Sequence, residues 1–225
     1  MKRIFAGEVY DIIPQPSGIV FSYCKEKSDD QVLVSYKMYS FETDKTTDVA
    51  KNIYLLSKYG SNYRLVTADF ENHITVKSVV LPNGKLFTVE TDGKATLFGT
   101  GGEILWQGIM TYRGNPPSDI AFCKNSLWCC YSEANAILRY NILTMRFELR
   151  IGGAKSPFYS PKDIFVSDEI AVLSNPPANR LVKVNLESFE AEDYKEFTES
   201  VYSYAKVKDT EFVVLDSGIY SFKSE

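Results

Sequence analysis

The sequence predicts an all-β fold, a five-bladed β-propeller of four-stranded antiparallel blades, with the last blade closed by the N-terminal strand. Three observations favour this fold. A 44-residue spacing relates the segments 132–141 and 176–185. Short apolar runs alternate with turn residues along the chain, and aromatic residues, which favour strands, make up 14% of it. Repeats of about 40–45 residues that hold four strands are typical of propellers.

The clearest repeat unit begins at a proline and contains four short strands. The motif Pro-x-Asp-Ile occurs at 117–120 and again at 161–164. In each copy a polar turn and an apolar run follow, at 127–131 and 170–173. A ladder of alternating residues and a final stretch rich in charged residues complete each unit. Turn residues end every run, which is the pattern of short antiparallel strands.

Four residues of the ladder recur at the same spacing and suggest its geometry. Asn135 and Asn179 occupy the turn from the second strand to the third, where we expect Asx-turns. Arg139 and Lys183 follow on the third strand and alternate with apolar neighbours. Each copy of the repeat is therefore interpreted as one blade, and the two blades have the same turns.

Three further units follow the same pattern with weaker identity. The stretch 76–107 contains four runs separated by Gly-containing turns, whose positive φ suits tight hairpins. The C-terminal stretch 201–223 contains only three runs, and the N-terminal segment 2–8 supplies the missing fourth strand. Closure in this way removes an exposed sheet edge. The expected first strands contain Ile12, Val79, Ile120, Ile164 and Ala205.

These units give a single propeller domain over residues 1–225. The expected blades span 8–56, 74–110, 117–153, 161–197, and 201–225 together with 2–8. A six-bladed ring would need about 45 more residues, so the sequence favours five blades.

One interval does not fit the repeat. The first two first-strand positions are 67 residues apart, whereas the later ones are separated by 41, 44 and 41 residues. We interpret 48–56 as the fourth strand of the first blade and 57–73 as an extra strand or hairpin. A helix over 48–58 is the alternative, although no residue there is a clear helix cap.

The charge and the distribution of apolar residues indicate which partners and which location to expect. The formal net charge is −4 and the pI is about 5.3, and only isolated basic pairs occur, so we expect no nucleic-acid partner. The N-terminus lacks the apolar run of a signal peptide, and no run is long enough to span a membrane. We therefore expect no membrane association and a cytoplasmic location.

The cysteines suggest neither a disulfide nor a metal site. Cys129 and Cys130 are adjacent on one expected strand, so their side chains point to opposite faces. Cys24 and Cys123 complete the set, without the paired spacing of a zinc site. We expect four reduced thiols, no metal and no cofactor.

The repeat resembles those of the NHL-type propellers and their relatives. The pattern of Pro-x-x-Ile, polar turn, apolar run and Asn-x-Ile/Leu matches best at 117–137 and 161–181, and more loosely over about two-thirds of the chain. Ser132 and Ser174 stand where that pattern usually has Asp. The resemblance implies the fold and no particular activity, since NHL-like proteins are mostly binding scaffolds and some are hydrolases or lyases.

Catalytic motifs are absent from the sequence. The single histidine, His73, lies in an expected loop and is interpreted as structural or exposed. Asp11, Asp119 and Asp163 lie at the start of first strands, near the expected axis, where paired carboxylates of a propeller glycosidase would lie. Asp119 and Asp163 recur with the repeat, however, so we expect them to satisfy backbone N–H groups.

Residues that break the repeat on one face are better ligand-binding candidates. Loops from the second strand to the third and from the fourth to the next first strand share a face in propellers. The loop 112–117 differs most from the repeat, although the sequence favours a solvated loop with an Arg–Tyr stack there. The candidates on that face are Tyr112, Arg113, Asn115, Glu90, Asp92, Glu133, Asn135, Asn175, Arg180 and Asp216.

The sequence thus favours a non-enzymatic binding scaffold for a protein or a small polar ligand. A hydrolase with paired carboxylates is the alternative, and a lectin-like sugar binder with one similar pocket per blade is a third hypothesis. The ligand and the oligomeric state are left open.

Overall fold

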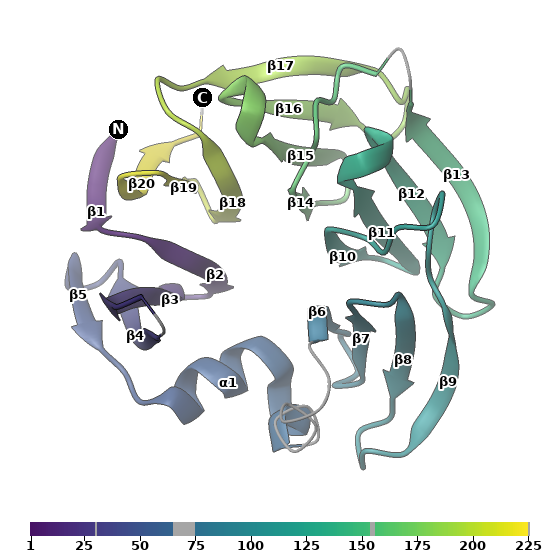
Figure 1. The fold of residues 1–225 in the computed structure, drawn as a ribbon, viewed down its shortest axis with the longest axis horizontal. Helices are drawn as coiled ribbons and strands as arrows, with labels where there is room; N and C mark the ends of the chain where they lie inside the picture. The colour runs from purple at the N-terminus through teal and green to yellow at the C-terminus, as the bar shows by residue number, and fades with distance from the viewer. Residues whose placement is uncertain (30, 65–74, 154–155, 225) are drawn as a thin grey trace.

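The computed structural model describes residues 1–29, 31–64, 75–153 and 156–224. Their strands form five four-stranded antiparallel sheets arranged as blades around an axis (Figure 1). The predicted five-bladed propeller, with its four-stranded blades and its N-terminal closing strand, is therefore confirmed. No helix in the described part of the chain is long and apolar enough to cross a membrane.

Each blade runs from an inner first strand to an outer fourth strand. Blade 1 contains β2 (Val9–Gln15), β3 (Gly18–Lys27), β4 (Val32–Ser40) and β5 (Lys45–Asp48). Blade 2 contains β6 (Thr75–Val80), β7 (Leu86–Glu90), β8 (Lys94–Phe98) and β9 (Ile104–Ile109). Blade 3 contains β10 (Asp119–Cys123), β11 (Ser126–Tyr131), β12 (Ala136–Asn141) and β13 (Arg146–Gly152). Blade 4 contains β14 (Asp163–Val166), β15 (Ile170–Asn175), β16 (Arg180–Asn185) and β17 (Ala191–Glu196).

The two ends of the chain meet in blade 5. This blade contains β18 (Val201–Val207), β19 (Thr210–Leu215) and β20 (Gly218–Lys223), and β1 (Lys2–Ala6) pairs antiparallel with β20 (Figure 1). Gly218 permits the close pairing, because a Cβ on it would lie 2.1 Å from the Phe5 carbonyl oxygen. Strand β1 thus covers the β20 edge that would otherwise be exposed.

The repeated asparagines act differently from the prediction. Asn135 and Asn179 follow the short 3-10 helices η2 (Ser132–Ala134) and η3 (Pro176–Ala178) and adopt left-handed φ values of 49° and 52°. The Asx-turns instead form at the next asparagine of each ladder. Asn141 Oδ1 accepts hydrogen bonds from two backbone N–H groups of the third-to-fourth-strand turn, and Asn185 Oδ1 does the same.

Apolar cores join neighbouring blades around most of the ring. Each core is shared by two sheets, and its members include Phe87 with Cys129 (blades 2 and 3), Cys130 with Leu173 (blades 3 and 4), Val172 with Val213 (blades 4 and 5), and Phe212 with Phe21 (blades 5 and 1). Cys129 and Cys130 lie in different cores, which confirms that they point to opposite faces. All four cysteines are free.

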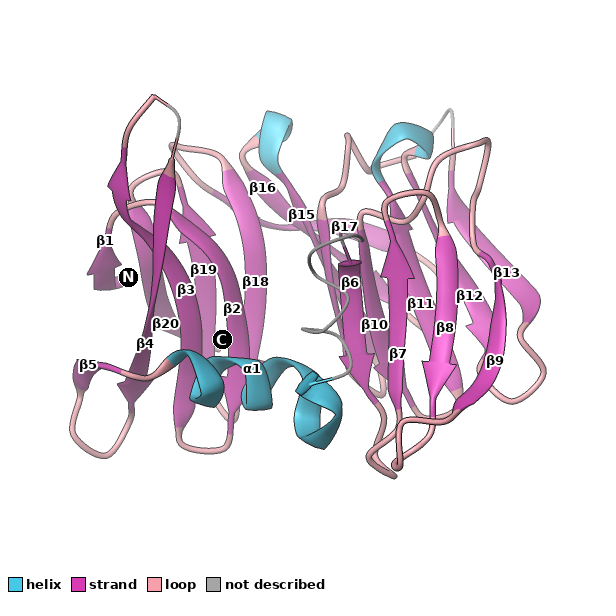
Figure 2. Ribbon diagram, turned by 60° about the horizontal axis from the view of Figure 1, so that its bottom comes forward, coloured by secondary structure: helices cyan, strands magenta, loops and turns pink. Residues whose placement is uncertain are grey.

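A helix joins blades 1 and 2. Helix α1 (Lys51–Tyr59) contacts β2, β3 and β4 on one side and β6 on the other. Tyr54 packs on Tyr36 of β4 with ring centroids 4.6 Å apart, whereas Tyr59 shares a small core with Leu86 of blade 2. Figure 2 shows α1 near the face opposite to η2 and η3. The helix therefore replaces direct packing between these two blades.

The predicted strand over 48–56 is wrong, and the helical alternative is correct. Strand β5 ends at Asp48, and α1 begins at Lys51 after Ala50, which provides no side-chain cap. The two buried tyrosines and their neighbours recur at helical spacing, as Tyr54 with Lys58 and Leu55 with Tyr59. Of the predicted extra strand or hairpin at 57–73, residues up to 62 lie in α1 and the 3-10 helix η1 (Gly60–Asn62), and 65–73 lie outside the described residues.

If α1 replaces a blade interface, its buried side should contribute strongly to stability. The Tyr59→Ala variant should lower the free energy of unfolding by about 3 kcal/mol, since its side chain is in the core. Leu56→Ala is the matched control, because Leu56 is 50% exposed and its loss should cost less than about 0.5 kcal/mol. Urea unfolding measures the free energy of unfolding of both variants. Equal losses of stability in the two variants would contradict this role of α1.

Candidate functional site

The first strands bring one polar side chain from each blade to the axis. These five residues are Asp11 on β2, Lys77 on β6, Asp119 on β10, Asp163 on β14 and Ser203 on β18. All five line one cavity at the axis, and all except Asp119 also line a second one. The cluster therefore lies between the two cavities at the centre of the ring.

Two of the axial aspartates connect successive blades. Asp119 Oδ2 accepts a hydrogen bond of 2.9 Å from the backbone N–H of Ile164 in blade 4. Asp163 Oδ2 accepts hydrogen bonds from the Tyr204 N–H (2.8 Å) and the Ser203 hydroxyl (2.7 Å) in blade 5. The recurring aspartates therefore satisfy backbone N–H groups, as their place in the repeat predicts.

Two lysines neutralise the carboxylates at the axis. Lys77 Nζ lies 3.3 Å from Asp119 Oδ1, and Lys58 Nζ of α1 lies 2.5 Å from Asp11 Oδ2. The Asp119 carboxylate is the main cause of a raised Lys77 pKa, with burial acting in the opposite direction. Burial alone would lower the Lys58 pKa, but Asp11 and the neighbouring tyrosines outweigh it, so that pKa is also raised. Both lysines are therefore charged at neutral pH.

Asp163 differs from the other axial carboxyl groups. Burial, the negative charge of Asp119 and a hydrogen bond with Asp119 raise its pKa well above the usual 3.8, against the opposing effects of Lys77 and the Tyr204 N–H. These effects favour the neutral acid at Asp163. With Asp163 neutral, the two axial lysines balance Asp11 and Asp119.

The larger cavity at the axis, here called the axial cavity, has a volume of about 630 Å³. Its lining includes Lys27, Lys162, Asp163, Tyr202 and Asp216. Residues of second-to-third-strand and fourth-to-first-strand loops contribute to it, so it opens on the face predicted for ligands. Its lining contains side chains that can carry positive charge and side chains that can carry negative charge.

Side chains at the wall of the axial cavity are held by neighbours. Lys162 Nζ lies 5.2 Å from the centre of the Tyr202 ring, and the Tyr202 hydroxyl donates a 2.7 Å hydrogen bond to Asp216 Oδ1. The Ser200 N–H donates to the other Asp216 oxygen, at 3.2 Å. The aromatic ring, the cation and the carboxylate are therefore pre-positioned beside one another.

The second cavity lies on the other side of the axial cluster and has a volume of about 280 Å³. Ser57 and Lys58 of α1 contribute to its lining, together with residues of all five first strands. The Lys58 ammonium and the Tyr54 hydroxyl, at 3.1 Å, both contact Asp11 Oδ2. Helix α1 thus covers this cavity and supplies one charge of the axial cluster.

The predicted loop 112–115 is a tight hairpin at the edge of the ring. Tyr112 and Asn115 exchange backbone hydrogen bonds of 2.9 and 3.1 Å, and Arg113 and Gly114 adopt positive φ. The Arg113 guanidinium lies 5.6 Å from the Tyr112 ring centre, and Arg150 donates to the Tyr112 hydroxyl at 2.9 Å. These contacts match the Arg–Tyr stack that the sequence also allowed.

Three other candidates hold the segment between blades 3 and 4. Asn135 Oδ1 accepts from the Ser160 N–H (2.7 Å), and Asn175 Oδ1 from the Tyr159 N–H (2.9 Å). Arg180 donates to the Pro157 carbonyl at 3.1 Å and pairs with Asp193 at 2.8 Å. The structure thus brings these three side chains to the loop between β13 and β14.

The remaining candidates lie in separate turns. Asp92 Oδ1 accepts from the Lys94 N–H at 2.8 Å, Glu90 lies 3.8 Å from Lys94 Nζ, and Glu133 lies in η2. Of the ten candidates, Asp216 lines the axial cavity, and the other nine are not among its lining residues. As ligand-binding residues, all ten remain a prediction. His73 lies outside the described residues.

Sequence reasoning missed the two axial lysines. In the strand pairing, Lys77 and Ser203 occupy the position that Asp119 and Asp163 occupy in blades 3 and 4. The predicted first-strand alignment through Val79 and Ala205 is one residue out of this register and therefore did not show them. Lys58 had no such signal, because its segment was interpreted as a strand or hairpin. Over the described ranges, no three His, Cys, Asp or Glu side chains are placed to hold a metal ion.

Comparisons with known proteins support the fold. No family model and no curated protein matches the chain. The computationally designed protein Ika4 is 11% identical, with 68% of this chain and 93% of Ika4 covered and a TM-score of 0.54. The designed protein Ika8 is 10% identical over 96% of this chain and 71% of Ika8, with a TM-score of 0.54.

A natural protein has a similar structure over nearly the whole chain. A streptogramin B lyase is 10% identical, with 97% of this chain and 69% of the lyase covered and a TM-score of 0.50. At this identity the similarity shows the fold alone. The comparisons therefore support the β-propeller fold.

The protonation of Asp163 predicts an unusual pH dependence. In the unfolded chain Asp163 loses its proton above its usual pKa of 3.8, whereas the folded protein retains it. Folding then takes up a proton, so Asp163 lowers the stability of the wild type progressively as the pH rises above that value. The Asp163→Asn variant should therefore gain stability relative to the wild type between about pH 4 and pH 7, measured by urea unfolding.

Asp119→Asn is the matched control for this prediction. It removes the partner of Lys77 and should lower the free energy of unfolding by about 2 kcal/mol or more at neutral pH. In Asp163→Asn, by contrast, the amide oxygen retains the acceptor role and the amide N–H₂ donates to Asp119. A constant stability difference between Asp163→Asn and the wild type across this pH range would contradict a protonated Asp163.

Proposed function

We propose that this protein is a non-enzymatic scaffold that binds a small polar ligand in the axial cavity. The observation that supports this most directly is the cavity itself, whose volume of about 630 Å³ falls in the range of ligand sites, roughly 300–1,000 Å³. It lies at the centre of a rigid ring and opens on the loop face. Fixed polar groups in such a pocket orient a ligand at little entropic cost.

The chemistry of the lining favours a polar ligand with both donor and acceptor groups. Lys162 lies over Tyr202 and forms no ion pair within the described residues, and so offers a donor. Asp216, oriented by Tyr202 and Ser200, offers an acceptor. The Tyr202 ring supplies a flat apolar surface between these charges.

A hydrolase with paired carboxylates is less well supported. Glycosidases hold their two carboxyl groups roughly 5–9 Å apart, so that substrate or water fits between them. Asp119 and Asp163 instead each accept a hydrogen bond from the backbone of the next blade, and Asp119 also pairs with Lys77. A lectin-like binder would have one similar pocket per blade, whereas this cavity is single and axial. A cytoplasmic location remains part of the proposal.

A thermal-shift screen tests the proposal. Purified protein is mixed with sugars, amino acids, nucleotides and metal ions, and a ligand bound only by the native state raises the unfolding midpoint. We expect at least one small polar compound to give a saturable rise that Lys162→Gln and Asp216→Asn abolish. Arg113→Gln, at the edge of the ring, should retain it.

The same screen separates the alternatives. A rise that disappears in Arg113→Gln and persists in Lys162→Gln would contradict the axial cavity and favour the 112–115 loop. A panel without any saturable rise would contradict the small-ligand proposal and favour a protein partner, which a pull-down with the intact chain would then identify.

A further inference from the structure

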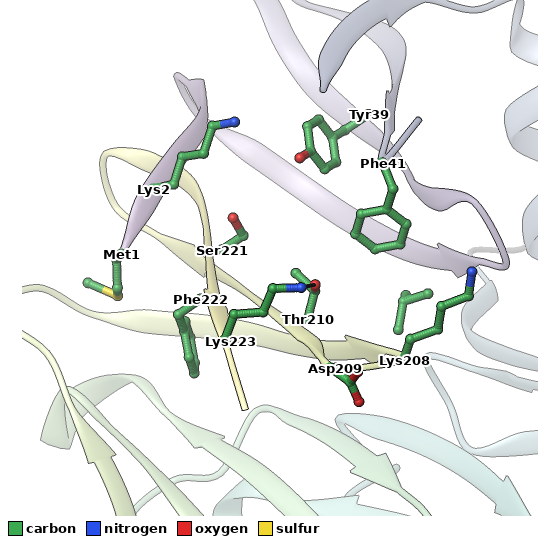
Figure 3. A pocket seen from close by; sticks show the side chains of 11 residues that line it. Met1, Lys2, Tyr39, Phe41, Lys208, Asp209, Thr210, Ser221, Phe222 and Lys223 are labelled. Carbon is green, nitrogen blue, oxygen red and sulfur yellow. Dashed lines mark hydrogen bonds between the residues drawn. The ribbon is translucent and has the colours of Figure 1, made fainter. Parts of the chain in front are cut away.

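A second pocket, of about 660 Å³, lies between blades 1 and 5 (Figure 3). It includes the β18–β19 turn and therefore lies on the face opposite to the axial cavity, which includes Asp216 of the β19–β20 turn. We call it the closure pocket, because both strands of the ring closure, β1 and β20, contribute to it. Its other walls come from the β18–β19 turn, which contains Lys208 and Asp209, and from Phe41 after β4. The pocket is therefore separate from the axial cavity.

Lysine amines dominate the charge of the closure pocket. Lys2, Lys208 and Lys223 line it, and among its described lining residues Asp209 alone is acidic. Lys2 pairs with Asp44. Lys223 Nζ donates a 3.1 Å hydrogen bond to the Thr210 hydroxyl, and across the described ranges neither Lys223 nor Lys208 forms an ion pair. In a chain of net charge −4, this is a local excess of positive charge.

Aromatic side chains form a fixed apolar wall beside these amines. Phe41 lies with its ring centre 6.0 Å from that of Tyr39 and 5.9 Å from that of the fully buried Phe212. The Tyr39 hydroxyl donates a 2.7 Å hydrogen bond to Asp44, so this ring is held at both ends. Phe222 also lines the pocket, and Lys195 Nζ lies 4.1 Å from its ring centre.

We propose that the closure pocket binds a small organic phosphate with an aromatic ring. A phosphate monoester carries a charge close to −2 at neutral pH and offers three acceptor oxygens. These complement the amines of Lys208 and Lys223, which form no ion pair within the described residues. The ring of the ligand packs on the wall formed by Tyr39 and Phe41. The pocket volume is within the range of small-ligand sites, roughly 300–1,000 Å³.

Titration calorimetry of the full chain with adenosine monophosphate tests this site. We expect saturable binding, and affinity for adenosine lower by about tenfold or more, because adenosine lacks the charge-assisted hydrogen bonds. The double variant Lys208→Gln/Lys223→Gln should weaken binding of adenosine monophosphate by a similar factor, whereas its affinity for adenosine should be unchanged.

Two further variants act as controls. Lys25→Gln/Lys51→Gln removes the same total charge from exposed positions outside the pocket and should leave the affinity within about twofold of the wild type. Lys162→Gln, in the axial cavity, should also leave it unchanged, which distinguishes this site from the one of the proposed function. Failure of adenosine monophosphate to bind, equal affinity for adenosine, or equal losses in the two double variants would each overturn the proposal.

Discussion

The hydrogen bonds that Asp119 and Asp163 accept at the axis from N–H groups of the next blade are the interaction on which the rest of this structure depends. The first strand of each blade pairs on one side only, with its second strand, so its inward N–H groups need other acceptors. Aspartate side chains supply them, at the cost of gathering carboxyl groups at the centre of the ring. The two lysines and the proton held by Asp163 compensate that charge. The partition between the two axial cavities follows from this arrangement.

Helix α1 fills the interface between blades 1 and 2 and also supplies a positive charge to the axial cluster. Among the described residues, blades 1 and 2 share no sheet-to-sheet core of the kind found at the other interfaces, and α1 packs between them through Tyr54 and Tyr59. The same helix places Lys58 against Asp11. An insertion that interrupts the repeat therefore provides both the missing packing and a cation that no first strand supplies.

The sequence predicted the fold well where a repeat was present. The 44-residue spacing, the first-strand positions and the N-terminal closing strand rest on local turn and strand patterns, which each blade satisfies independently. Segment 48–56 was misinterpreted because its helical period is short and uncapped. The axial site was only partly predicted: the aspartates recur with the repeat, whereas Lys58 meets them only through tertiary packing. Most of the candidate loop residues proved to support turns, since turn residues and ligand residues share the same chemistry.

The central claim is that a protonated Asp163 joins the blades at the axis. Infrared spectroscopy tests it most directly, because a carboxylic acid and a carboxylate absorb at different frequencies. At neutral pH the wild-type protein should show the carbonyl band of a buried carboxylic acid, and Asp163→Asn should lack it. A wild-type spectrum at neutral pH without a band that this substitution removes would contradict the account.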